Sequence, residues 1–229
     1  MLMNARLLGL ALFALASAPA AAQVPPTPAE TAAYTGLFAA ASRGDAAQVE
    51  RLAAQGADVK VRDGYGRTPL HVAAYARRQD AMRALVKAGA DPNVLESDKY
   101  DIITIAAVAD DPVTLQTALE LGGNPGNITS RYDGTALIAA AHLGHDEVVR
   151  ILIKAGAPLD HVNNLHWTAL IESIVLGQGG PRHVATLKAL VEAGASTKLA
   201  DRGGNTPLVL AKGRGYAPMV AILEKAGAR

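Results

Sequence analysis

The residues that could perform chemistry in this 229-residue chain are few and do not converge on one reaction. His142 and His145 are three positions apart, a spacing that can place two metal ligands on one helix face. Protein metal sites use three or four ligands, however, and the chain has no cysteine, while Asp146 is expected to face elsewhere. We therefore expect no metal site and no cofactor.

Two further segments resemble parts of catalytic sites but have structural explanations. The run Gly177-Gln178-Gly179-Gly180 is rich in glycine, yet it lacks the Lys-Ser/Thr ending of a phosphate-binding loop. Asp110 and Asp111 precede Pro112, which predicts a helix N-terminus, where carboxylates stabilise the positive end of the helix dipole. No Ser-His-Asp, Cys-His or paired-carboxylate set emerges, so we predict a protein that is not an enzyme. A catalytic site assembled from distant parts of the chain is the alternative.

A small dipeptide recurs along the chain at a nearly constant spacing and indicates a repeated structural unit. The copies are Gly56-Ala57, Gly89-Ala90, Gly156-Ala157, Gly194-Ala195 and Gly227-Ala228, with Gly122-Gly123 as a variant. The steps between them are 33, 33, 34, 38 and 33 residues. A period near 33 is typical of stacked helical repeats, which offer extended surfaces for binding.

Residues 63–95 show the plan of one unit. Thr68 can cap the N-terminus of a helix whose first turn contains Pro69. Ala73-Ala74 are small, so a neighbouring helix can approach this one closely. Gly89 follows a second helix and can adopt the left-handed conformation that ends it.

These motifs resemble the ankyrin repeat. The run Thr68-Pro-Leu-His-Val-Ala-Ala74 is the most recognisable stretch, and Gly144-His145 matches a later position of the repeat. The resemblance extends from about Tyr34 to Arg229. It implies an all-α solenoid of stacked helix-turn-helix units with projecting hairpin loops. It also implies a structural role for His71, binding to other proteins, and no catalytic residues.

The N-terminus predicts export. An apolar run of about ten residues follows Arg6 and leads to Ala20-Ala21-Ala22, an order typical of a secretory signal peptide and too short to span a bilayer. We expect residues 1–22 to be removed by cleavage before Gln23, or else after Ala20. The protein would then be periplasmic or secreted.

The rest of the chain divides into a short linker and a repeat domain. Residues 23–32 hold three prolines and predict an extended linker, and residues 33–229 form the domain. Its six repeats, numbered one to six below, are expected at about 33–62, 63–95, 96–129, 130–162, 163–200 and 201–229.

The charge balance excludes one class of partner. The chain has 22 basic and 21 acidic residues, and loss of Arg6 with the signal peptide leaves equal numbers. Nucleic acids require a net basic surface, so we expect no nucleic-acid binding. No second apolar stretch reaches membrane length, so we expect no membrane insertion after cleavage. The protein should be a monomer that binds another protein.

Aromatic side chains are the first candidates for partner contact. Tyr65, Tyr100, Tyr132 and Trp167 fall within three residues before the first helix of repeats two to five. Tyr and Trp often anchor interfaces, and aromatic residues make up only 4% of this chain. We expect the four rings to form one solvent-facing row along the hairpin tips. The alternative is that each ring folds onto the next hairpin.

Three other side chains complete the predicted binding surface. Tyr75 and His142 occupy equivalent positions on the first helices of their repeats and should face the concave side. Arg67 belongs to a basic group in repeat two that neighbours an acidic group in repeat three, a dipole that could orient a partner. The predicted function is a non-enzymatic scaffold or stabilising partner in the periplasm. A secreted effector that binds a host or competitor protein is the alternative.

Overall fold

The computed structural model describes residues 23–229, so the predicted signal peptide lies outside the described residues. Within this range the regular structure consists of α-helices, and the β-type pairing is a single bridge between Thr129 and Gly134. The predicted all-α solenoid is confirmed.

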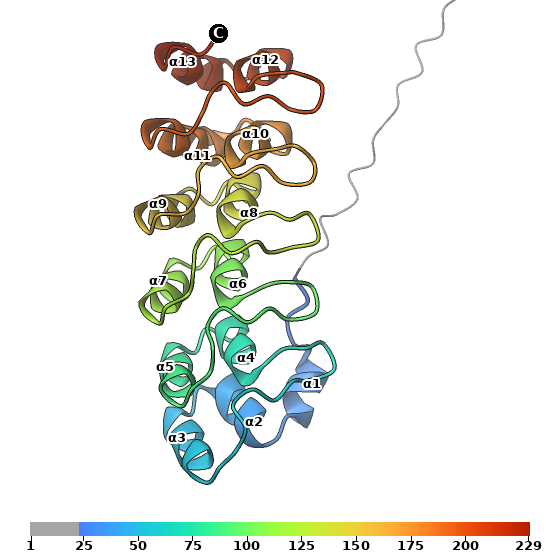
Figure 1. Cartoon of the computed structure of the whole chain (residues 1–229), viewed down its shortest axis with the longest axis vertical. Helices are drawn as coiled ribbons and strands as arrows, with labels where there is room; N and C mark the ends of the chain where they lie inside the picture. Colours follow the sequence, from blue (N-terminus) through green and yellow to red (C-terminus); the bar gives the residue numbers. More distant parts are fainter. Residues whose placement is uncertain (1–22) are drawn as a thin grey trace, which may run out of the picture.

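Within residues 23–229, six helix pairs stack along one axis (Figure 1). The inner helices, next to the hairpin loops, are α2 (Gly36–Arg43), α4 (Pro69–Tyr75), α6 (Ile102–Val108), α8 (Ala136–Leu143), α10 (Ala169–Val175) and α12 (Pro207–Gly213). The outer helices are α3 (Ala46–Ala54), α5 (Gln79–Lys87), α7 (Pro112–Glu120), α9 (Asp146–Lys154), α11 (Pro181–Glu192) and α13 (Ala217–Lys225). The hairpins all project from the same edge of the stack.

Local sequence sets the ends of these helices. Thr68 caps α4 together with His71, and Pro69 occupies the first turn. Asp111 caps α7 by accepting a hydrogen bond from the Thr114 N–H. Gly89, after α5, has a φ of +98°, the left-handed conformation expected of it. The cap predicted at Thr68 and the helix N-terminus predicted after Asp110 and Asp111 are confirmed.

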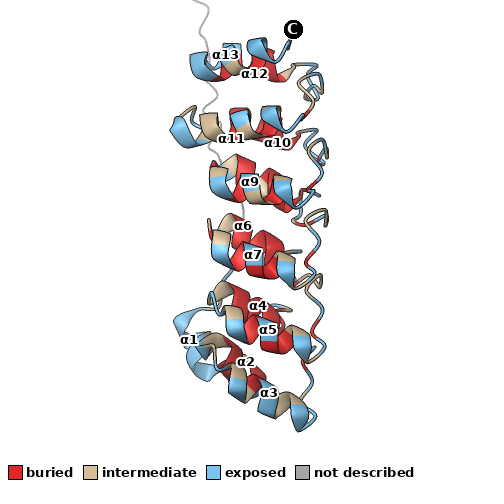
Figure 2. Ribbon diagram, turned by 90° about the vertical axis from the view of Figure 1, so that its left-hand side faces the viewer, coloured by how far each residue is buried: buried red, intermediate tan, exposed pale blue. Residues whose placement is uncertain are grey.

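Alanine at the centre of the inner helices allows close stacking. Ala73, Ala106 and Ala140 are at most 1% exposed. Helix α8 contacts both α6 and α10, so each repeat is held by its two neighbours. Figure 2 shows the buried residues, in red, continuing through the stack.

The glycine-rich run of repeat five is a packed connection between α10 and α11. Gly179 has a φ of +66°, and a Cβ there would come within 2.5 Å of the Tyr216 ring. The Tyr216 hydroxyl donates to the Gly177 carbonyl at 3.0 Å. The run thus joins repeat five to repeat six, which is the structural explanation of its glycines.

The N-terminal segment differs from the extended linker expected for residues 23–32. It contains the short helix α1 (Pro28–Ala33), which Figure 1 shows beside α2 and α4 on the side of the hairpins. Its side chains and carbonyls bond to repeats two and three. We call residues 23–34 the N-terminal strap.

Candidate partner-binding surface

In the hairpins of repeats two, three, five and six, one residue at the start organises the backbone. The Asp63 Oδ1 atom accepts hydrogen bonds from the backbone N–H groups of Tyr65 and Arg67, at 2.9 and 3.0 Å. Asn163 holds its hairpin in the same way through the N–H groups of Leu165 and Trp167. Glu96 does so in repeat three and Asp201 in repeat six.

The hairpins are also bonded to each other. The Ser97 N–H donates to the Tyr65 carbonyl at 3.0 Å, and the Asn164 N–H donates to the Tyr132 carbonyl at 3.0 Å. Each hairpin therefore presents its side chains from a fixed backbone. A partner that binds this edge does not have to order it first.

The four aromatic residues do not form the single row that was expected. Tyr65 and Tyr132 lie at hairpin tips and are 45% and 40% exposed. Tyr100 and Trp167 are half-buried, because they occupy the last hairpin position before the helix, equivalent to that of Arg67. The prediction of one solvent-facing row is wrong for these two.

Arg67 is fully buried rather than solvent-facing, at 0% exposure. Its Nε donates to the Asp63 Oδ2 at 2.7 Å, its Nη2 to the Glu30 Oε1 at 2.5 Å, and its Nη1 to the Val24 carbonyl at 3.1 Å. The Tyr65 ring lies 4.5 Å from the guanidinium carbon in a cation–π contact. The structure therefore contradicts the expectation that Arg67 faces solvent: it anchors the strap.

Asp63 is the second anchor of the strap. Its Oδ2 also accepts a hydrogen bond from the Tyr34 hydroxyl at 2.7 Å, and Tyr34 stacks on Phe38. Burial acts to raise the pKa of Asp63, but the hydrogen bonds from Tyr34 and Arg67 outweigh it and the pKa is lowered. The carboxylate therefore stays charged beside Arg67.

Tyr75 and His142 lie on inner helices, as predicted, and both are half-buried. Burial raises the pKa of Tyr75, whose hydroxyl oxygen is buried and, within the described residues, has no hydrogen-bond partner. His142 places its Nδ1 3.4 Å from the Glu172 Oε2. Burial, and then the neighbouring His183 and His145, lower the pKa of His142.

Glu172 is a component of this surface that sequence reasoning missed. It is only 4% exposed on α10, and its Oε1 accepts a hydrogen bond from the Asn163 Nδ2 at 2.8 Å. Burial raises the pKa of Glu172 to about 7. The sequence does contain a clue: Glu172 is an acidic residue at the helix position that holds the apolar Val72 in repeat two. Burial thus shifts both members of the Glu172–His142 pair toward their uncharged forms.

Comparison with known proteins identifies the repeat. Residues 11–96 and 103–197 match the family model described as ankyrin repeats (3 copies). The chain belongs to the ankyrin-repeat family. The ankyrin-repeat protein YahD of Escherichia coli K12 is 33% identical over 190 residues, which are 82% of this chain and 94% of YahD.

Solved ankyrin domains share the architecture. An ankyrin repeat domain from Acinetobacter baumannii AYE is 39% identical with a TM-score of 0.79, covering 84% of this chain and 98% of that one. The mouse B-cell lymphoma 3 protein homolog is 30% identical to this chain. The match covers 75% of this chain and 38% of that longer protein. Ankyrin repeats are typically non-enzymatic modules that bind other proteins.

Charges on the ankyrin stack pair between neighbouring repeats. Arg83 of repeat two lies 2.8 Å from Glu120 of repeat three, and Lys87 lies 3.0 Å from Glu50 of repeat one. Arg77 lies 3.3 Å from Asp111. The basic group of repeat two and the acidic group of repeat three therefore form ion pairs with each other within the ankyrin stack. This weakens the interpretation that their charges form a dipole that orients a partner.

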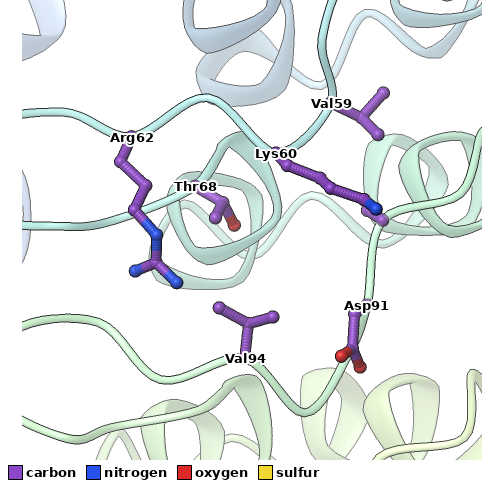
Figure 3. A pocket seen from close by; sticks show the side chains of 7 residues that line it. Val59, Lys60, Arg62, Thr68, Asp91 and Val94 are labelled. Carbon is purple, nitrogen blue, oxygen red and sulfur yellow. The ribbon is translucent and has the colours of Figure 1, made fainter.

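A small cavity lies between repeats one and two (Figure 3). Its volume is about 210 Å³, below the roughly 300–1,000 Å³ of typical ligand pockets. Arg62, which lines it, donates to the carbonyls of Gly66 and Leu95 and so joins one ankyrin repeat to the next. Among residues 23–229 no three His, Cys, Asp or Glu side chains are grouped as a metal site.

The described part of the chain contains no helix long and apolar enough to cross a membrane. Its longest ankyrin helix, α11, has 12 residues, against about 20 for a spanning helix.

Proposed function

We propose that this ankyrin-repeat protein is a non-enzymatic scaffold or stabilising partner that binds another protein through the hairpin side of repeats four and five. The supporting observation is the exposed Tyr132 ring, held on a hairpin that is bonded to the hairpin of Trp167. His142 and Glu172 lie on the inner helices of the same two repeats. The bonds of the strap go to repeats two and three, so this second half of the edge is available.

We further propose that the protein acts in the periplasm after removal of residues 1–22. The predicted signal peptide supports this, and the strap begins at Gln23, so it would remain on the processed chain. A secreted effector is the alternative function, and cell fractionation with N-terminal sequencing separates the two. Met1 on a membrane-bound product would contradict both.

The binding role can be tested by crosslinking pull-down from the periplasmic fraction, followed by affinity measurements on the captured protein. Trp167→Ala should weaken binding by about 2 kcal/mol, as truncation of an interface anchor does. Tyr132→Ala should also weaken binding while leaving the melting temperature nearly unchanged, because its ring is exposed. Val113→Ala is the matched control, since Val113 is 62% exposed on the outer helix α7.

Trp167 is half-buried, so its truncation can also lower the melting temperature. Affinity must therefore be expressed per folded molecule, from a thermal melt of the same sample. Unchanged affinity per folded molecule for both Tyr132→Ala and Trp167→Ala would show that these rings are structural.

A further inference from the structure

The strap is bound to the hairpin side of repeats two and three, and its contacts show the chemistry that this surface recognises. We propose that this region is a binding site for an acidic segment with a Thr-Pro-x-Glu turn. The strap is its resident occupant, and a partner segment of the same chemistry enters by displacing it. This proposal rests on the proposed protein-binding role and names the chemistry of one partner segment.

The receptor for this segment is preformed within repeat two. Asp63 holds both the Nε and the backbone N–H of Arg67, and the Tyr65 ring covers the guanidinium. The two remaining nitrogens, Nη1 and Nη2, both donate to the strap. A buried guanidinium requires acceptors for all its donors, so these two nitrogens select a carbonyl and a carboxylate.

The strap presents its carboxylate through a capping turn. The Thr27 N–H donates to the Glu30 Oε2 at 2.8 Å, and the Glu30 N–H donates to the Thr27 Oγ1 at 3.2 Å. The other carboxylate oxygen, Oε1, is thereby left for Arg67. Pro28 starts the turn, and its fixed φ lowers the entropy lost on docking.

Polar anchors, rather than a buried apolar face, hold the strap. Helix α1 has no buried residue. Gln23 donates to the Thr104 carbonyl at 2.9 Å, and Tyr34 donates to Asp63. A segment held in this way can exchange with another of like chemistry, because the solenoid core does not depend on it.

The covalent link between the strap and α2 explains why the strap, and not a separate peptide, occupies the site. A short tether gives a local concentration in the millimolar range, so a free peptide competes poorly unless the strap is weakened. Weakening the strap should therefore reveal the site to a peptide in trans.

The probe is a fluorescent peptide with the sequence of residues 23–34, titrated against the full chain by anisotropy. A chain with Glu30→Gln should bind this peptide at least about tenfold more tightly than the unmodified chain, because its own strap has lost the charged contact. The same peptide with Glu30→Gln should bind that chain at least about tenfold more weakly. Glu50→Gln is the control: it changes an exposed carboxylate of α3 and should leave peptide binding as in the unmodified chain.

A second variant tests the site independently of whether Glu30→Gln folds correctly. Thr27→Ala breaks the capping turn at an exposed residue and should also expose the site. The chain has no cysteine, so a dye on Thr31→Cys reports release of the strap as peptide binds. The proposal is overturned if neither variant gains affinity for the peptide, or if the Glu and Gln peptides bind equally well. Both results leave capture of a partner by repeats four and five untouched, so this failure is distinct from failure of the proposed function.

Discussion

Two buried ionisable groups on the hairpin side, Arg67 in repeat two and Glu172 in repeat five, are accommodated in different ways. Arg67 keeps its charge, because Asp63 and Glu30 lie within 2.7 Å of its nitrogens. Glu172 has an uncharged amide, Asn163, as its hydrogen-bond donor, and burial raises its pKa to about 7. One end of the stack therefore buries an ion network, and the other buries an acid that is largely protonated below neutral pH.

The difference has consequences for binding. The network around Arg67 includes the strap, so the hairpin side of repeats two and three is already occupied. Within residues 23–229 no such occupant lies on the surface of repeats four and five, and the charge of this surface changes as Glu172 titrates. A partner there meets an uncharged Glu172 in mild acid and a buried negative charge at Glu172 above neutral pH.

The largest effect is expected from breaking the network at Arg67. Arg67→Met leaves Asp63 and Glu30 without their counter-ion, and loss of one partner of a buried ion pair destabilises by about 3–5 kcal/mol. The free energy of unfolding from urea titration measures this, and protease cleavage within residues 23–34 should accelerate. Arg83→Met is the control, because that exposed pair with Glu120 should contribute at most about 1 kcal/mol. Equal losses in the two variants would contradict the role assigned to Arg67.

A smaller effect is expected in the core of repeat four. Ala140 is fully buried on α8, and Ala140→Leu should destabilise by roughly 1–3 kcal/mol through overpacking. Hydrogen exchange should then speed up in repeats three and five as well, because α8 contacts α6 and α10. The increase in exchange rate should be smaller in repeat three than in repeat five. The strap links repeat three to repeat two, because it bonds to both Thr104 and Arg67. Faster exchange confined to repeat four would rule out this coupling.

The features that sequence reasoning predicted well are local or periodic. The cap at Thr68, the helix N-terminus at Asp111 and the left-handed Gly89 depend on neighbours within a few residues. The solenoid follows from the repeat period. His71 also behaves as the resemblance implied: its Nδ1 accepts from the Thr68 N–H, and its Nε2 lies 3.0 Å from the Val94 carbonyl.

The features that were missed depend on contacts distant in sequence. Arg67 and Glu30 are 37 positions apart, and nothing near either residue indicates that they meet. Three prolines within residues 23–32 are typical of an extended linker, and composition alone does not reveal a docking site for it. Trp167 directly precedes Thr168, whereas Tyr65 lies three positions before Thr68, so the two residues are not equivalent. The hydrogen bonds to Asn163 show that Trp167 is two positions further along its hairpin.

The comparison between the two buried groups predicts opposite pH dependence for two substitutions. In Glu172→Gln the amide oxygen can still accept from Asn163, and no charge is buried at any pH. From the usual pKa of 4.5 to about 7, folded wild-type protein holds a proton that the unfolded chain releases, so wild-type stability falls as pH rises. The advantage of Glu172→Gln should grow across this window to about 3 kcal/mol and then level off. The lowered pKa of His142 contributes to both proteins and largely cancels in the difference.

Asp63→Asn should behave in the opposite way. The pKa of Asp63 is lowered from its usual 3.8, so its contribution to stability is present above that pH and lost as pH falls through the folded value. The deficit of Asp63→Asn should therefore be full at neutral pH and shrink in strong acid.

Urea unfolding of the wild type, Glu172→Gln and Asp63→Asn from about pH 2 to pH 8 tests the central claim most directly. The structure predicts that Glu172→Gln gains on the wild type as pH rises through the window of Glu172, while Asp63→Asn recovers only as pH falls below the usual pKa of Asp63. A Glu172→Gln curve parallel to that of the wild type, or an Asp63→Asn deficit that does not change with pH, would contradict it.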